Sequence, residues 1–144
     1  MKQLLAACLL LLTALPVLAE PADMNLYIML WPEGDADEPK AAQMIEIDAG
    51  QIHVFTSENL ETEQDKSTPA DPARVALVSA AIQAVFGTIS MDAVPEQTGD
   101  TIAVEWSVGN AATFARGTTT FPITALPSAI LAVQDEIFGA RLTP

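Results

Sequence analysis

The chain has 144 residues and a formal net charge of −13 at neutral pH, from 6 basic and 19 acidic residues. This excess of carboxylates argues against nucleic acid as a partner, because no basic surface is available to replace phosphate counterions. Anionic membranes are disfavoured for the same reason. Cationic partners are favoured: a basic protein, a basic peptide or a metal ion. The alternative is that the acidity only keeps the protein soluble.

The first 19 residues are typical of a secretory signal peptide. Lys2 precedes a mostly apolar run from Leu4 to Leu15, Pro16 interrupts this run, and Ala19 ends the segment. Cleavage after Ala19 leaves residues 20–144, enough for one acidic domain with a core. A membrane anchor is the alternative, but the run is shorter than the roughly 20 residues a spanning helix needs. We expect a periplasmic or secreted bacterial protein without membrane contact after cleavage.

The only cysteine, Cys8, lies within this N-terminal segment. The mature chain is therefore predicted to contain no disulfide, no thiol nucleophile and no thiolate metal site. Its stability must come from packing alone, which the 50% hydrophobic content allows.

Residues Met24–Pro32 read MNLYIMLWP, and both of the alternating sets of side chains are apolar. This pattern is typical of a strand that is central in a sheet or covered on both faces. The polar segment near residues 32–42 is predicted to be a loop.

Residues Met44–Phe55 predict a β-hairpin. Its apolar β-branched residues share one face only if the connecting loop has an even number of residues; they are Ile45, Ile47, Ile52 and Val54. This register places Glu46 opposite His53, the only histidine, on the other face. Either Ala49-Gly50 alone or residues 48–51 form the turn.

The polar segment Thr56–Asp71 is predicted to be a mobile linker or loop. Asp71 and Pro72 then start a helix as N-cap and first-turn proline. Gly87 is predicted to end this helix. The buried stripe of the helix is expected to comprise Val75, Val78, Ile82, Val85 and Phe86.

A second hairpin is predicted over residues 101–117, with Gly109-Asn110 as a two-residue turn. Glu105 and Arg116 fall diagonally on one face, where they could pair. The apolar face carries Ile102, Val104, Trp106 and Val108. A second helix is expected from about Leu126-Pro127 to a cap at Gly139, with a buried stripe of Ile130, Val133, Ile137 and Phe138.

This order of elements predicts an α+β two-layer sandwich. We expect a mostly antiparallel sheet of about five strands with two helices packed on one face. A hairpin followed by a helix occurs twice, which is consistent with an internal duplication as well as with chance.

Three groups of residues are candidates for binding. Glu46 opposite His53 resembles a catalytic base that is oriented by a carboxylate. The alternative is an exposed cross-strand charge pair without a function, which is common on sheets. The acidic loop offers hard oxygen ligands for calcium, or is simply solvated; its candidates are Asp35, Asp37 and Glu38. Trp31 is a candidate partner contact, with packing as the alternative.

The sequence contains no GxSxG, HExxH or phosphate-binding glycine loop, and one histidine without cysteine suits zinc poorly. We therefore predict no catalytic residue, no bound metal and no cofactor. The expected function is that of a small exported binding or accessory protein that engages a cationic protein or peptide. A carboxylate- or histidine-dependent periplasmic hydrolase and a calcium-binding module are the alternatives.

Overall fold

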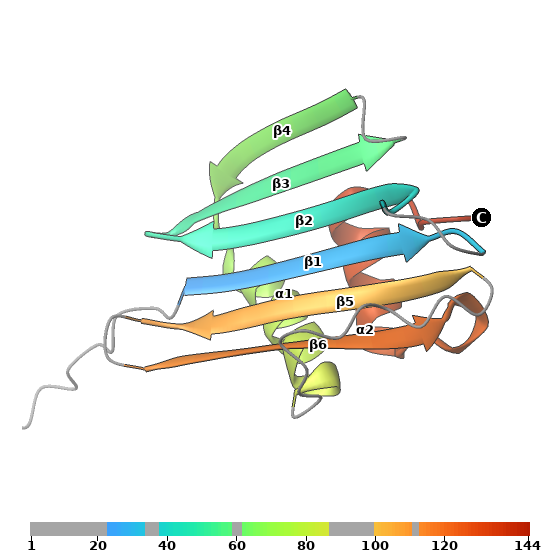
Figure 1. Cartoon of the computed structure of the whole chain (residues 1–144). Helices are drawn as coiled ribbons and strands as arrows, with labels where there is room; N and C mark the ends of the chain where they lie inside the picture. Colours follow the sequence, from blue (N-terminus) through green and yellow to red (C-terminus); the bar gives the residue numbers. More distant parts are fainter. Residues whose placement is uncertain (1–22, 34–37, 59–61, 87–99, 111–112) are drawn as a thin grey trace, which may run out of the picture.

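Six antiparallel strands form one sheet in the order β4-β3-β2-β1-β5-β6 (Figure 1). The computed structural model describes residues 23–33, 38–58, 62–86, 100–110 and 113–144. The strands are β1 (Asp23–Trp31), β2 (Ala41–Asp48), β3 (Gln51–Glu58), β4 (Thr62–Pro69), β5 (Thr101–Gly109) and β6 (Phe114–Pro122). The helical elements are α1 (Pro72–Val85), the 3₁₀ turn η1 (Ile123–Ala125), α2 (Ser128–Val133) and the π-helical η2 (Gln134–Phe138), which continues α2.

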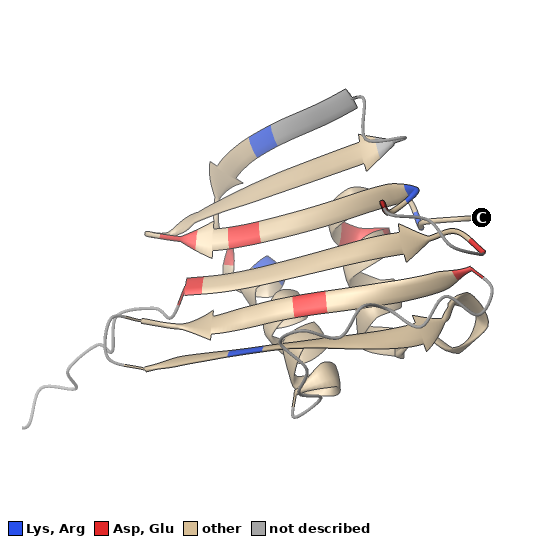
Figure 2. Ribbon diagram, viewed as in Figure 1, with Lys and Arg blue, Asp and Glu red and all other residues tan. Residues whose placement is uncertain are grey.

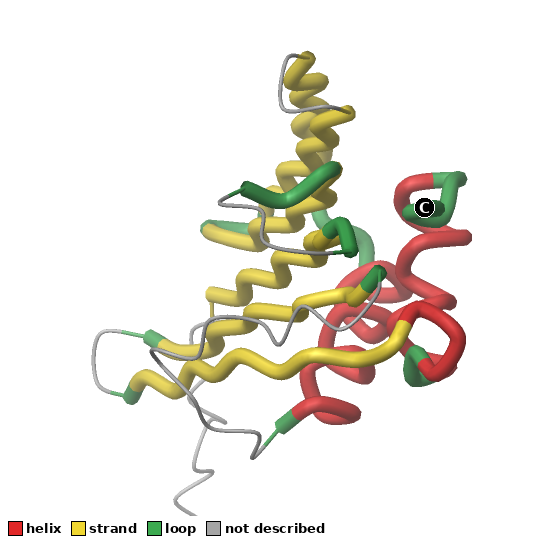
Figure 3. The backbone as a smooth tube through the Cα atoms, turned by 45° about the vertical axis from the view of Figure 1, so that its right-hand side comes forward, coloured by secondary structure: helices red, strands yellow, loops and turns green. Residues whose placement is uncertain are grey.

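Both helices pack against the same side of the sheet, as the turned view shows (Figure 3). The predicted α+β two-layer fold is therefore confirmed, with one strand more than the five expected. We call the side that carries the helices the covered face and the opposite side the open face. The strand β1 lies between β2 and β5, in agreement with its doubly apolar sequence.

The hydrophobic core lies between the covered face and the helices. Alternate residues of β1 point into it, and Leu26, Ile28 and Leu30 are fully buried. Each buried aliphatic side chain of this size contributes roughly 1.5–3 kcal/mol. Further fully buried core residues are Ile45, Ile52, Ile102 and Val104 from the sheet, and Val78, Ile130 and Val133 from the helices.

The first hairpin has the predicted register. Ile47 pairs with Ile52, and Glu46 pairs with His53. Its turn is the shorter of the two alternatives, since Ala49 has φ 41° and Gly50 has φ 78°. Two successive positive φ angles define the type I′ turn that joins twisted strands tightly.

The second hairpin has the predicted faces but not the predicted turn. Gly109 pairs with Phe114, so the connection is longer than the expected Gly109-Asn110 turn. Asn110 forms its start instead, because its backbone N–H donates to the Thr113 carbonyl at 2.7 Å and its side-chain oxygen accepts from the Thr113 N–H at 3.0 Å. The register moves by four residues, and an even shift leaves every side chain on its face.

The interpretation of residues 56–71 as a linker is wrong. The strand β3 extends to Glu58, and Thr62–Pro69 pair with it as β4. Lys66 and Thr68 are exposed, and the sequence of β4, TEQDKSTP, contains no apolar period that could reveal a strand. The strand is held by its backbone ladder and by its short connection to α1.

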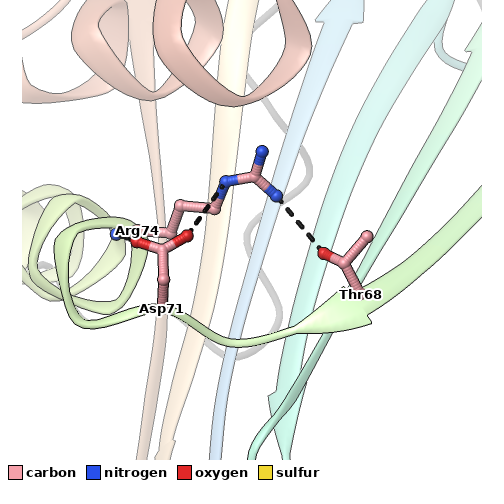
Figure 4. A network of polar contacts seen from close by, with 3 residues as sticks. All are labelled: Thr68, Asp71 and Arg74. Atoms are coloured by element: carbon pink, nitrogen blue, oxygen red, sulfur yellow. Dashed lines mark hydrogen bonds and ion pairs between the residues drawn. The ribbon is translucent and has the colours of Figure 1, made fainter.

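A network of polar contacts joins β4 to the start of α1 (Figure 4). Asp71 caps the helix as predicted, since its carboxylate accepts from the Arg74 backbone N–H at 3.0 Å. The Arg74 guanidinium lies 3.4 Å from the same carboxylate and donates to the Thr68 hydroxyl at 3.3 Å. Immediately before the helix, the Ala70 N–H donates to the Gly50 carbonyl at 3.0 Å. The helix start is thereby tied to both β4 and the first hairpin.

The predicted stripe of α1 is correct except at its end. Val78, Ile82 and Val85 are buried, whereas Phe86 is 60% exposed and its ring packs on Trp106 at 5.0 Å between centroids. The backbone of Phe86 is already extended, so its side chain leaves the helical stripe. The predicted cap at Gly87 lies outside the described residues. Gly139 ends η2 with φ 69°, as expected for a C-terminal glycine.

The two edges of the sheet differ in composition. Within the described sheet, β4 and β6 each have a neighbour on one side only. The sequence of β4 includes the three charged residues Glu63, Asp65 and Lys66, whereas that of β6 includes one, Arg116. Charge on an edge strand opposes pairing with another chain, so the β6 edge is the less protected one.

The turn of the first hairpin can be tested by substitution. A Cβ atom at Gly50 would meet nothing within 4 Å, so Gly50→Ala acts through the backbone alone. We expect it to lower the free energy of unfolding by about 1–2 kcal/mol, because φ is positive there. Ala49→Asn creates the preferred Asn-Gly turn and should raise this free energy by about 0.5–1 kcal/mol. Urea denaturation measures both, and an unchanged stability of Gly50→Ala would contradict the type I′ geometry.

Candidate functional site

The open face is organised in rows that cross the strands, because paired residues of neighbouring strands lie side by side. Two of these rows line the pockets of this face. The polar row consists of His53, Glu46, Asn25, Ser107 and Arg116, in the order β3-β2-β1-β5-β6. The aromatic row, two residues further along each strand, consists of Phe55, Met44, Tyr27, Glu105 and Thr118.

A third row forms a small apolar cluster at one end of the open face. Met29, Ala42 and Ala103 are almost completely buried, and Tyr27 and Trp31 pack against them. Trp31 is thus a packing residue of this small cluster, although it is only partly buried. The Trp31 Nε1–H, like the hydroxyl of its cross-strand neighbour Thr101, is buried and has no hydrogen-bond partner in the described part of the chain.

At the other end of the open face lies a pocket of about 230 Å³, which we call the acidic pocket. Three carboxylates line it: Asp23 at the start of β1, and Glu46 and Asp48 at the end of β2. Figure 2 shows these acidic positions of β1 and β2 at the same end of the sheet. The antiparallel pairing of β1 with β2 is what brings them together. Such a cluster attracts cations.

A second pocket of about 340 Å³ adjoins the first, and we call it the aromatic pocket. Tyr27, Met44 and Glu105 line it, together with Phe114, which is 67% exposed. The two pockets share Asn25, Ser107 and Phe114.

The boundary between the two pockets is polar. The Asn25 amide donates to the Ser107 hydroxyl at 3.2 Å and holds both groups in place. The two pockets lie side by side over β1 and β5, and we call the pair of them the trough.

His53 contacts a different carboxylate from the one predicted. It lies opposite Glu46 in the register, but its Nε2 is 3.6 Å from the Asp48 Oδ1. The His53 ring also stacks on Phe55 with 6.5 Å between centroids. The side chains of His53 and Asp48 are 29% and 50% exposed, and an ion pair so open to water contributes about 0–1 kcal/mol. The pair borders the acidic pocket without being enclosed.

The candidate calcium loop falls mostly outside the described residues, since Asp35 and Asp37 are not described. Glu38 is exposed. Among the described residues, no group of three or more histidine, cysteine or acidic side chains is placed to hold a metal ion.

The covered face contains a cleft of about 310 Å³ between β3 and the C-terminal segment. Gln43 lines this cleft and belongs to a buried glutamine pair. Gln134 donates to the Gln43 side-chain oxygen at 2.9 Å, and the Gln43 amide donates to the Ala140 carbonyl at 2.8 Å. These bonds anchor η2 and the residues after it to β2.

An ion pair lies at the mouth of this cleft. Arg141 donates to both carboxylate oxygens of Asp135, at 2.8 and 2.6 Å. This hydrogen bonding, supported by the attraction between the two charges, lowers the pKa of Asp135 and raises the pKa of Arg141. The guanidinium is therefore already engaged within the chain and is a poor site for a further anion.

Sequence reasoning named Glu46 of the acidic pocket but missed Asp23, Asp48 and the whole aromatic pocket. Glu46 and His53 were recognisable from the hairpin register alone. Phe114 and Asn25 reach the same surface only through the pairing of β1 with β5 and of β5 with β6. The available signal was Phe114 itself, because an aromatic residue beside a hairpin turn is not needed for the core.

The chain matches no known protein-family model, and it has no match among curated proteins. In the described residues, none of the helices combines the length and the apolar character that a membrane span requires.

The ion pair at the C-terminal cleft allows a test of the electrostatics. In Arg141→Gln, we expect the pKa of Asp135 to rise toward its ordinary value of 3.8, because the charged donor is lost. NMR titration of the Asp135 carboxyl carbon measures this shift, and Arg74→Gln serves as the control that should leave it unchanged. In the wild type, the contribution of the pair to stability is complete above the unfolded-state pKa and is lost as pH falls through the lower folded-state pKa. An unaltered Asp135 titration in Arg141→Gln would contradict the pairing.

Proposed function

We propose that the chain is a small exported binding protein whose open face engages a basic protein or peptide. The observation that carries this proposal is the acidic pocket, in which Asp23, Glu46 and Asp48 converge beside the exposed ring of Phe114. Carboxylates steer and hold lysine or arginine side chains. An aromatic ring adds a cation–π contact to the same groups.

The character of this surface favours binding over hydrolysis. A general base needs a positioned reacting group and a site that excludes water. His53 and Asp48 instead lie at an open rim, where water screens their charges. An exposed surface of this kind is suited to binding a basic partner, because charged groups at a solvent-exposed rim mainly raise the rate and the specificity of association.

Export is the second part of the proposal, and residues 1–19 support it. A basic residue, an apolar run and small residues before a cleavage point are the features of a secretory signal. Its removal takes Lys2 away and leaves the exported chain one unit more negative. The exported chain would therefore meet its basic partner in the periplasm or in the medium.

Export can be tested by expressing the full coding sequence in a Gram-negative bacterium. We expect the protein in the periplasmic fraction or medium, and we expect its N-terminus at Glu20. Intact-mass spectrometry and N-terminal sequencing measure this. An uncleaved chain in the cytoplasm or in the membrane pellet would contradict the proposed location.

Binding can be tested with a lysine decapeptide as the cationic probe. Replacing two charges of the acidic pocket in Glu46→Gln/Asp48→Asn should weaken its affinity about five- to tenfold at low salt, because each exposed charge contributes up to about 1 kcal/mol. The affinity of the wild type should fall further as salt shortens the screening length. Isothermal titration calorimetry at several salt concentrations measures both effects.

The matched control removes two charges at the opposite end of the same strands. Glu33→Gln/Glu38→Gln changes the net charge equally, but Glu33 and Glu38 lie where β1 ends and β2 begins. This variant should bind almost as the wild type does. Equal weakening in both variants would show that the acidic pocket acts only as one part of a diffuse negative charge. An affinity that does not depend on salt concentration would contradict the electrostatic proposal.

A further inference from the structure

The trough of the open face is amphipathic along its length. Its acidic pocket carries three carboxylates. Its aromatic pocket combines the apolar surfaces of Tyr27, Met44 and Phe114 with one carboxylate, Glu105, and with Arg116. Phe114 belongs to both pockets. A ligand that presents a cationic group and a large apolar group side by side matches the carboxylates of the first pocket and the apolar surfaces of the second.

The spacing between the two pockets is set by the strands beneath them. Glu46 and Met44 are two residues apart on β2, and Asn25 and Tyr27 are two residues apart on β1. Side chains two residues apart on a strand point the same way and lie about 7 Å from one another. An extended peptide has the same repeat, so its residues i and i+2 can face the polar row and the aromatic row at once.

The distribution of carboxylates determines which side of the trough receives the cation. Three of them, Asp23, Glu46 and Asp48, lie on β1 and β2 around one pocket. On the side of β5 and β6, the single carboxylate Glu105 lines the same pocket as Arg116. A positive side chain is therefore attracted most strongly to the side of β1 and β2.

We propose that the trough recognises an extended segment of a basic protein in which a lysine or arginine is followed or preceded, two residues away, by a large apolar or aromatic residue. The basic side chain enters the acidic pocket, and the apolar side chain rests on Tyr27, Met44 and Phe114. This inference rests on the proposed function and adds the partner's conformation and the spacing of the two side chains it presents.

Two peptides of identical composition test the spacing. In Ac-Gly-Lys-Gly-Trp-Gly-NH₂ the lysine and tryptophan are two residues apart, and in Ac-Gly-Gly-Lys-Trp-Gly-NH₂ they are adjacent, on opposite sides of an extended chain. We expect the first to bind the full chain about tenfold more tightly than the second. NMR titration measures weak affinities of this kind, and the resonances of Asn25 and Ser107 in the wild type should shift.

Two exposed phenylalanines provide a matched pair of variants. Phe114→Ala should remove the preference for the first peptide, whereas Phe86→Ala, which alters an exposed ring on the covered face, should keep it. Circular dichroism confirms folding of each variant. If a variant does not fold, the residues of the wild type whose chemical shifts change on addition of the peptide still locate the binding site.

The outcomes separate this inference from the proposed function. Equal binding of both peptides, with weakening in Glu46→Gln/Asp48→Asn, would overturn the spacing rule and leave an acidic surface that binds any cation. Shifts confined to residues outside the trough would overturn the site. Absence of binding by both peptides, while the lysine decapeptide binds, would also overturn the inference, and failure of all three probes would overturn the proposed function with it.

Discussion

Two helices packed on one face of the sheet are the constraint on which the rest of the molecule depends. They require that the residues of β1, β2, β3 and β5 that point to the helices be mostly apolar. The buried exception is Gln43 of β2, whose side chain is hydrogen-bonded to Gln134 and Ala140. The other residues of these strands are then directed to the open face, whatever their chemistry. The acidic pocket, the aromatic row and His53 lie on one surface because the alternate residues of the same strands are buried in the core.

The sequence is most informative where one face of a hairpin must be buried. Ile45, Ile47, Ile52 and Val54 specify a single register, and the structure has it. The second hairpin shows the limit of the same reasoning: its loop was misassigned, yet every face was right because the error was an even number of residues. β4 was missed for the opposite reason, since its sequence, TEQDKSTP, has no apolar period to detect.

The candidate site was predictable only in its local part. Glu46 and His53 come from one hairpin, so the register sufficed to place them together. The trough also needs Asn25 from β1, Ser107 from β5 and Phe114 from β6, which are far apart in the sequence. Neither the apolar period nor the turn chemistry specifies that β1 inserts between the two hairpins, and this insertion creates the surface.

The low charge of the β6 edge gives the strong negative charge of the chain a second role. Apart from Arg116, the strand carries no charge that would discourage another copy from adding its own edge strand. With a net charge of −13, two copies repel one another before their backbones can meet. The chain's pI is about 4.1, so this repulsion weakens steadily in mildly acidic surroundings. Colloidal stability in this protein is thus a collective property of its carboxylates, spread over the whole surface and not built into the exposed strand itself.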